Sequence, residues 1–248
     1  MSVIIKTDDE IAVMRQAGRV TAEVLRILAN SVRAGIETRE LDVIAEKECH
    51  QRGALPSFKG YHGFPASVCV SVNDEVVHGI PGKRVIREGD IVSIDFGVIY
   101  DGFQGDAAVT VGVGRTSPAA QRLMEATEGA LWAGIKAART GSHLGDISAA
   151  IQDHAEARGF TVVREYTGHA IGRDMHEDPL VPNFGIPGTG ILLKKGMTLA
   201  LEPMLNIGDW RTRRADDDWT VLTVDGSLSA HFEHTIAITN GEAEVLTR

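Results

Sequence analysis

Apolar residues recur at the three- and four-residue spacing of an amphipathic helix in four stretches of the chain. Thr7 and Glu10 form the pattern of a capping box before the first stretch, and Pro118 after Ser117 is typical of a helix start. A glycine follows the second and the fourth stretch, as it does at many helix C-termini. The pattern predicts helices over residues 7–31, 38–53, 117–139 and 144–159.

Short runs of β-branched and apolar residues lie between and beyond these helices, which is typical of strands. The run from Ile91 ends in Asp95, and the chain returns through Asp101-Gly102 to Asp106 before the next apolar run. Asp-Gly between two such runs is a turn signal that predicts a β-hairpin. Strands are expected over residues 67–72, 91–95, 107–111, 160–165, 198–202, 220–224 and 233–238.

The order of two helices followed by strands occurs twice, which indicates an internal repeat. Arg33-Ala34-Gly35 corresponds to Arg139-Thr140-Gly141 at an offset of 106 residues (139 − 33), and Asp95 corresponds to Glu202 at an offset of 107 (202 − 95). A carboxylate thus ends the same strand in both halves. The sequence predicts an α+β fold with pseudo-twofold duplication, in which a curved antiparallel sheet flanked by helices surrounds a site that both halves furnish. We expect one domain over residues 1–248, with halves at about 1–113 and 114–248.

Composition limits the compartment and the classes of partner. The 248 residues are 43% apolar and 24% charged, which is enough for a large single core. The net charge of −9 argues against binding to nucleic acid or to an acidic membrane, because phosphate groups are bound by Lys and Arg. No apolar run has the length of a membrane span or of a signal peptide, and Cys49 and Cys69 do not form a disulfide framework. We therefore expect a cytoplasmic protein with no direct nucleic-acid or membrane partner.

The two aspartates of the predicted hairpin are the first candidates for chemistry. Burying Asp95 and Asp106 as free ions would cost several kcal/mol each, so they should be paired, protonated or bound to a cation. The hairpin offers no Lys or Arg as a partner, which favours a cation. The alternative is that both are turn residues that face solvent, and these residues alone leave it open.

One stretch in the second half begins like the zinc-binding helix of zinc peptidases but does not complete its motif. His176-Glu177-Asp178-Pro179 begins like the His-Glu-x-x-His sequence of zinc peptidases, but Leu180 replaces the second histidine. Pro179 would also break the helix that such a motif requires. We therefore expect no metal site of this type.

Several ordered motifs together resemble the type I methionine aminopeptidases, metallopeptidases with the so-called pita-bread fold. The resemblance spans essentially the whole chain. Its most specific parts, besides the hairpin, are residues 60–65 (Gly-Tyr-His-Gly-Phe-Pro), 77–81 (Val-His-Gly-Ile-Pro), 168–172 (Gly-His-Ala-Ile-Gly), 176–179 (His-Glu-Asp-Pro), 201–204 (Leu-Glu-Pro-Met) and 233–235 (Glu-His-Thr).

The resemblance implies a site for two divalent metal ions. The chemistry of the donors agrees, because four carboxylates carry a charge that two divalent cations cancel and would otherwise repel one another. An oxygen-rich set with one imidazole suits manganese, iron, cobalt or zinc, and the sequence does not choose among them. The expected ligands are Asp95, Asp106, His169, Glu202 and Glu233.

The resemblance also implies the reaction, which is removal of the N-terminal methionine from nascent proteins whose second residue is small. A metal-bound hydroxide would attack the first peptide bond, with Glu202 as the proton shuttle. His176 would hydrogen-bond the scissile carbonyl or its oxyanion, and His78 the following peptide unit. An apolar pocket for the thioether side chain would be formed by Phe58, Tyr61, Phe64, Cys69, Met175 and Trp219.

Two alternative functions share this fold. Proline-specific peptidases have the same metal ligands, but they usually carry a further N-terminal domain, whereas here the first helix begins within the first dozen residues. A metal-free relative that only binds peptides would have lost ligands, and this chain keeps all five. The resemblance further implies transient contact with the ribosome, and a monomer is the default expectation.

Overall fold

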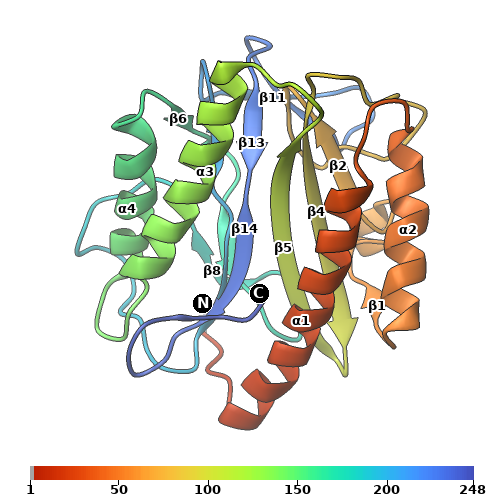
Figure 1. Ribbon diagram of the computed structural model, residues 1–248. Coiled ribbons are helices and arrows are strands. Elements are labelled where there is room, and N and C mark those ends of the chain that lie inside the picture. The colour runs from red at the N-terminus through yellow and green to blue at the C-terminus, as the bar shows by residue number, and fades with distance from the viewer. Residues whose placement is uncertain (1–2) are drawn as a thin grey trace.

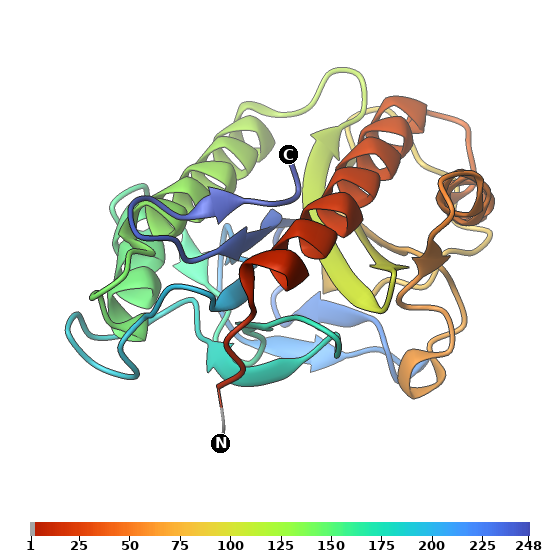
Figure 2. The ribbon, with the colours of Figure 1, turned by 90° about the horizontal axis from the view of Figure 1, so that it is seen from below.

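The computed structural model describes residues 3–248, in which four α-helices cover one face of a curved β-structure (Figures 1 and 2). Two helices lie over each half of the chain. The expected helices are confirmed to within a few residues at their ends. The helices are α1 (Asp8–Ser31), α2 (Thr38–Gln51), α3 (Pro118–Ala137) and α4 (Leu144–Glu156), with a short 3-10 turn, η1, at Tyr61–Gly63.

The helix ends follow from local chemistry. Glu10 N–H donates to Thr7 Oγ1 at 3.2 Å, and Thr7 N–H donates to Glu10 Oε2 at 3.0 Å, which completes the predicted capping box of α1. Ala120 N–H donates to Ser117 Oγ at 3.1 Å in front of α3. Gly53 follows α2 and has a φ of 70°, a left-handed conformation that favours glycine. The helix therefore ends slightly before residue 53, the end expected from the sequence.

The strands form one large antiparallel sheet and two small ones. The large sheet runs in the order β1-β4-β5-β14-β9-β7-β8, with β2 paired to β4 and β15 to β14. It comprises β1 (Leu55–Pro56), β2 (Cys69–Val72), β4 (Ile91–Tyr100), β5 (Phe103–Gly112), β7 (Gly168–Ala170), β8 (Glu177–Val181), β9 (Thr198–Leu201), β14 (Glu233–Ala237) and β15 (Glu244–Val245).

The two small sheets have three strands each and the orders β13-β10-β6 and β11-β12-β3. The strand expected over residues 160–165 is wrong in length, because β6 pairs with β10 through Thr161 and Val162 and the contact ends with Val163 N–H, which donates to Met204 O at 3.0 Å. The strands of these sheets are β3 (Glu75–Val77), β6 (Thr161–Val162), β10 (Met204–Asn206), β11 (Thr212–Arg214), β12 (Val221–Thr223) and β13 (Ser229–His231).

The β4–β5 hairpin is confirmed and is longer than the pattern predicted. Ten residue pairs join the two strands, from Ile91 opposite Gly112 to Tyr100 opposite Phe103. The connection consists of Asp101 and Gly102 alone, both with positive φ (48° and 77°), as a two-residue hairpin turn requires. Asp95 and Asp106 therefore lie within the strands and not in a solvent-facing turn.

Backbone hydrogen bonds repeat between the two halves, which confirms the duplication. Gly35 N–H donates to Ile86 O at 2.9 Å, and Gly141 N–H donates to Leu193 O at 3.0 Å. The donors are 106 residues apart and the acceptors 107, which are the offsets found in the sequence. In each half, the second helix thus begins shortly after an equivalent backbone hydrogen bond to a loop that is distant in the sequence.

Two apolar clusters fill the space between helices and sheets, one beneath each helix pair. Leu28 of α1 and Phe96 of β4 are fully buried in the first cluster, and Leu123 of α3 and Ile151 of α4 in the second.

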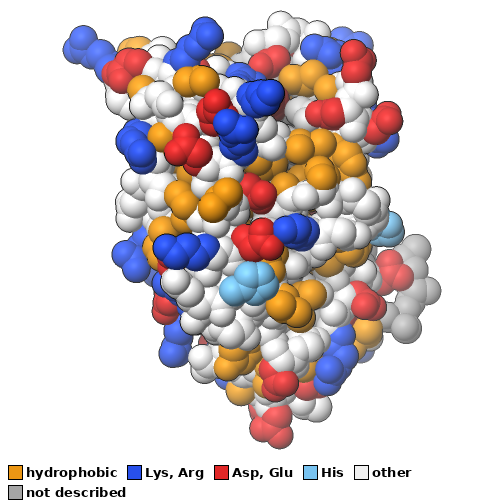
Figure 3. Space-filling model, turned by 90° about the vertical axis from the view of Figure 1, so that its right-hand side faces the viewer, with side chains coloured by type: hydrophobic (Ala, Val, Ile, Leu, Met, Phe, Trp, Pro, Cys, Tyr) orange, Lys and Arg blue, Asp and Glu red, His pale blue; other side chains and the backbone are white. Residues whose placement is uncertain are grey.

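Acidic and basic side chains intermingle with scattered apolar ones on the side of the molecule near α2 (Figure 3). None of the helices in the part of the chain from residue 3 onward has the length and apolar character needed to cross a membrane.

Helix α1 lies directly on β5, and one glycine allows this close approach. A Cβ on Gly105 would lie 2.9 Å from the carbonyl carbon of Ala17 and 2.9 Å from the nitrogen of Gly18. Both are backbone atoms and cannot swing away as a side chain can. The position of α1 over the hairpin therefore depends on the absence of a side chain at residue 105.

The substitution Gly105→Ala tests this packing. We expect it to lower the free energy of unfolding by about 1–3 kcal/mol, because the helix must shift to admit the methyl group. Thermal unfolding should show a fall in Tm of about 2–4 °C for each kcal/mol. Gly241→Ala is the control, since a Cβ there meets nothing within 4 Å. An unchanged Tm for both variants would contradict the packing argument.

Candidate active site

A cavity of about 250 Å³ opens between the two halves, and it brings together every site residue expected from the sequence. One further residue, His62, also lines it. The lining residues are Phe58, Tyr61, His62, Phe64, Cys69, His78, Asp95, Asp106, His169, Met175, His176, Glu202, Trp219 and Glu233.

Four of the five ligand candidates lie in strands of the large sheet: Asp95 in β4, Asp106 in β5, Glu233 in β14 and His169 in β7. Glu202 directly follows β9, the strand between β14 and β7. The register explains why they share a face. Gly97 pairs with Asp106, and Ala108 pairs with both Asp95 and Glu233, so side chains with a period of two reach the same side. The strands of both halves therefore supply the cluster.

Gly97 leaves room for the cavity. A Cβ at this position would lie 3.0 Å from Phe58 Cε1, 3.1 Å from Met175 Cε and 3.2 Å from Asp106 Oδ1. The glycine thus keeps the floor of the cavity open where the carboxylates meet the apolar side chains.

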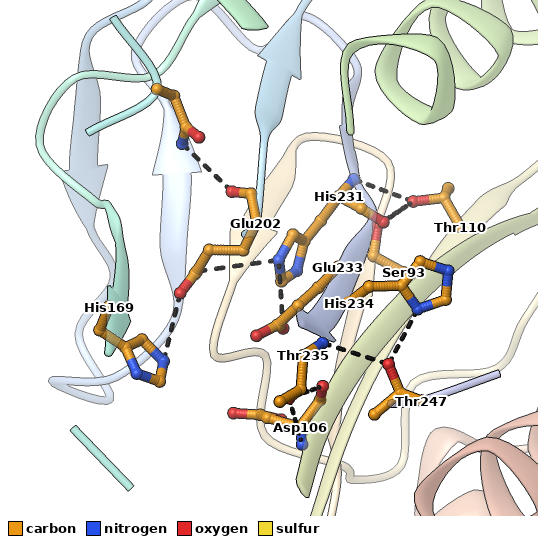
Figure 4. A network of polar contacts seen from close by, with 11 residues as sticks. Ser93, Asp106, Thr110, His169, Glu202, His231, Glu233, His234, Thr235 and Thr247 are labelled. Atoms are coloured by element: carbon orange, nitrogen blue, oxygen red, sulfur yellow. Dashed lines mark hydrogen bonds and ion pairs between the residues drawn. The ribbon is translucent and has the colours of Figure 1, made fainter. Parts of the chain in front are cut away.

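Three of the candidates already have the spacing of a metal site. One ligand atom from each of Asp106, His169 and Glu233 lies within 4.8 Å of the others, and all three residues are buried. Glu202 is adjacent, with its Oε1 3.5 Å from His169 Nε2 (Figure 4). Asp95 and Glu202 are more open to the cavity than the other three.

The carboxylates are held close together without a compensating charge from the chain. Burial raises the pKa of Asp106 to about 7. Burial first, and then the charges of neighbouring carboxylates, raise the pKa values of Asp95, Glu202 and Glu233 well above their ordinary range. Within residues 3–248, no Lys or Arg forms an ion pair with any of the four.

Unsatisfied atoms in the cluster fit a cation. Asp95 Oδ1, Asp106 Oδ1 and Glu233 Oε1 are buried and have no hydrogen-bond partner among the residues that the structure describes. Such oxygens are costly unless they are bonded, and divalent cations bind them readily. The donor set therefore fits divalent metal ions.

His169 has the form of a metal ligand. Its Nδ1 lies 3.0 Å from the carbonyl oxygen of Ala170, and since a carbonyl can only accept, Nδ1 carries the proton. Nε2 is then left with a lone pair toward the carboxylates. Burial lowers the pKa of His169 to about 3, so the ring is neutral at pH 7.

His176 and His78 also line the cavity. The hydroxyl of Tyr61 is 2.7 Å from Nδ1 of His176, and the His176 ring lies 4.2 Å from the ring of His169. His78 adopts a positive φ of 59° directly after β3, and burial lowers its pKa to about 4. Its ring meets that of Tyr166 edge-on at 5.9 Å.

The apolar candidates form one end of the cavity. Phe64 and Trp219 meet edge-on with ring centres 5.1 Å apart, and both pack with Phe58 and Cys69. Burial raises the pKa of the Cys69 thiol well above its usual value, so it remains a neutral, weakly polar lining group. This end of the cavity suits an apolar side chain that contains a polarizable atom such as sulfur.

A buried ion pair fixes the segment that carries Met175 and His176. Lys6, which precedes α1, donates to the Glu177 carboxylate, and the backbone N–H of Arg173 donates to Glu177 Oε1 at 3.1 Å. Glu177 begins strand β8, which also contains Pro179, so the excluded zinc helix is indeed absent here. The N-terminal segment thus holds the loop at the cavity in place.

Sequence reasoning gave no role to two histidines of this region. His62 lies inside the quoted motif of residues 60–65 and meets Tyr61 edge-on at 4.4 Å. His231 is buried behind Glu202 and Glu233, 3.8 Å from an oxygen of each. The only signal for His231 in the sequence is its place two residues before Glu233, on the same side of an extended chain.

The fold and the oxygen-rich site together define a metallopeptidase of the pita-bread class. The model of metallopeptidase family M24 matches residues 12–240, and the chain belongs to this family. Among curated relatives, the methionine aminopeptidase of Clostridium perfringens is 53% identical over 245 residues, which cover 99% of this chain and 98% of the relative.

Solved structures agree with this assignment. The crystal structure of methionine aminopeptidase from Thermotoga maritima is 48% identical, with a TM-score of 0.98 and complete coverage of both chains. The prolidase from Pyrococcus furiosus is 22% identical, with a TM-score of 0.80, and the match covers 99% of this chain but 65% of the prolidase. At that identity the second likeness is one of fold alone.

The raised pKa of Asp106 predicts how stability depends on pH without metal. The folded protein keeps a proton on Asp106 up to about pH 7, whereas the unfolded chain releases it near its ordinary value of 3.8. Because the folded state binds more protons between these values, Asp106 should progressively destabilise the metal-free fold as pH rises from about 4 to 7. Below about pH 4 it should have no effect.

Asp106→Asn removes this titration and one candidate metal ligand. We expect the Tm of the metal-free variant to exceed that of the metal-free native chain increasingly as pH rises toward 7, while added Mn²⁺ stabilises the variant much less. Thermal unfolding with and without Mn²⁺ measures both effects. The histidines are the same in the native chain and the variant, so their contribution to the pH dependence cancels in the comparison. The exposed Asp153→Asn is the control. Parallel pH curves for native chain and Asp106→Asn would refute the assignment.

Proposed function

We propose that this chain is a methionine aminopeptidase, which removes the first residue of polypeptides that begin with methionine. The observation that carries the proposal is the arrangement of one imidazole and four carboxylates in, or directly after, five neighbouring strands, directly beside an apolar pocket. The relatives named methionine aminopeptidase match over nearly the whole chain, which supports the same activity here.

We propose two divalent cations, held by Asp95, Asp106, His169, Glu202 and Glu233. The four carboxylates would balance two such charges, and manganese, iron, cobalt and zinc all suit the donor set. When bound, divalent cations supply Lewis acidity and make a water molecule more acidic. Because ligands come from both halves, we propose that residues 1–248 act as a single catalytic domain.

The side chains around the cluster have distinct roles in the proposed hydrolysis. Glu202, at the boundary between cluster and cavity, takes the proton from the attacking water and passes it to the leaving amine. His176 donates a hydrogen bond to the oxygen of the scissile carbonyl, where negative charge develops. His78, which also lines the cavity, binds the next peptide unit.

Tyr61 determines which nitrogen of His176 carries the proton. Burial and the nearby charge of Asp174 raise the pKa of Tyr61, so its hydroxyl stays neutral at 2.7 Å from Nδ1 of His176, and we propose that it is the donor of this hydrogen bond. The ring proton then resides on Nε2, the nitrogen that is free to donate to a carbonyl oxygen. Tyr61 is thus a positioning residue for His176.

The pocket formed by Phe58, Tyr61, Phe64, Cys69, Met175 and Trp219 suits the methionine side chain. Aromatic edges and the neutral Cys69 thiol offer favourable contacts to a thioether sulfur. We propose that the second substrate residue must be small, as the family resemblance implies. Nascent polypeptides are the corresponding natural substrates.

The alternative functions are less well supported. A proline-specific peptidase shares the fold, but the match to the prolidase is far lower in identity than the matches to methionine aminopeptidases. A protein that only binds peptides has no need for four clustered carboxylates, three of which have buried oxygens without a hydrogen-bond partner.

The cellular setting is also a proposal. Nascent substrates imply transient contact with the ribosome in the cytoplasm, where the unpaired Cys49 and Cys69 would stay reduced. One chain supplies every proposed site residue, which supports a monomer as the active form.

Release of free methionine from Met-Gly-Met and Met-Leu-Met tests the proposed activity. We expect metal-stripped protein to cleave neither peptide, and protein with added manganese, cobalt or iron to cleave only the first. His176→Ala should lower kcat by about 100- to 1,000-fold while metal binding remains, because it removes the oxyanion donor. His154→Ala, on the surface of α4, is the control. Cleavage of neither peptide by metal-loaded protein would refute the assignment.

Tyr61→Phe tests the tautomer argument. We expect kcat to fall about tenfold with little change in KM, because one hydrogen bond that orients His176 is lost. Steady-state kinetics with Met-Gly-Met measures both constants. Tyr166→Phe is a matched control, since Tyr166 contacts His78 through its ring. If Tyr61→Phe raised KM alone, the hydroxyl would serve the substrate and not His176.

A further inference from the structure

His231 is the one buried histidine beside the carboxylate cluster that does not line the cavity. Its side chain is almost completely inaccessible to solvent, and its Nε2 lies 3.8 Å from Glu202 Oε2 and 3.8 Å from Glu233 Oε2 (Figure 4). Nε2 has no hydrogen-bond partner within residues 3–248. A buried nitrogen that faces two carboxylates without a closer partner requires an explanation.

The fold brings this imidazole to the corner between two sheets. Strands β9 and β14 pair in the large sheet, with Leu201 opposite His234, and β10 and β13 pair in a small sheet, with Met204 opposite His231. The chain bends between β9 and β10 and again between β13 and β14. Glu202 lies at one bend and Glu233 directly after the other, so His231 stands behind both carboxylates.

A buried network of hydroxyl groups fixes the backbone of His231. Its N–H donates to Thr110 Oγ1 at 2.9 Å, and Thr110 Oγ1 donates to its carbonyl oxygen at 2.8 Å. Thr110 also lies 2.8 Å from the hydroxyl of Ser93, its cross-strand partner in the β4–β5 hairpin (Figure 4). The hairpin that carries Asp95 and Asp106 therefore fixes the place of His231.

We propose that His231 is a positioning residue that directs its Nε2–H at the inner oxygens of Glu202 and Glu233, 3.8 Å from each, and so stabilises the negative charge of both carboxylates. Only a donor fits there, because a ring lone pair would face the lone pairs of two carboxylates. The contact holds both side chains in one orientation and leaves their other oxygens for cations. The inference rests on the divalent cations of the proposed function, but not on the peptide substrate.

Metal affinity tests this role without any peptide. We expect His231→Leu and His231→Met, which lack a donor, to raise the dissociation constant for Co²⁺ by about 10- to 100-fold. His231→Gln keeps a donor of similar reach and should stay within about threefold of the native value. Titration calorimetry gives the constants, and the visible absorption of the Co²⁺-loaded protein reports ligand geometry.

Circular dichroism of each metal-free variant checks that it is folded, and the use of two donor-free variants guards against failure of one. His154→Leu, remote from the cluster, is the matched control and should bind Co²⁺ as the native chain does. Native affinity and spectrum in a folded donor-free variant would overturn the proposal, as would an equal loss in His231→Gln. If His231 affected Co²⁺ binding but no methionine peptide were cleaved, the proposed function alone would fail.

Discussion

The repulsion among four buried carboxylates is the constraint on which this structure depends. The chain places Asp95, Asp106, Glu202 and Glu233 together and offers them no Lys or Arg, so their pKa values rise and several oxygens lack partners. A cluster of this kind opposes folding unless a cation joins it. The apolar clusters on both sides and the neutral His169 complete a rigid frame that tolerates this repulsion.

The duplicated sheet explains how such a cluster can be held at all. Each candidate ligand lies in a strand of its own or, for Glu202, directly after one, and antiparallel register with a period of two directs them to one face. The chain bends after β9 and before β14. These two bends leave space for His231 behind the carboxylate cluster and for the cavity in front of it. Chemistry and fold are therefore set by the same strand pairings.

The sequence predicts the long elements well because they carry strong local signals. The capping box at Thr7 and the Asp101-Gly102 turn both form as expected. Strands of two or three residues, such as β7 and β13, have no period to detect and exist only through their partners, which also explains the overlong strand expected over residues 160–165. The motifs point to the residues that line the cavity, whereas His231 belongs to none of the quoted motifs and owes its place to distant contacts with Thr110.

The distribution of the proposed ligands over both halves has a consequence for the order in which the protein would become active. During synthesis the first half can form its hairpin with Asp95 and Asp106, but two carboxylates make a weak site for a divalent cation. The set is complete only after Glu233 has been made and β14 has inserted between β5 and β9. Uptake of metal would then coincide with closure of the sheet, so that partly made or truncated chains remain inactive as hydrolases.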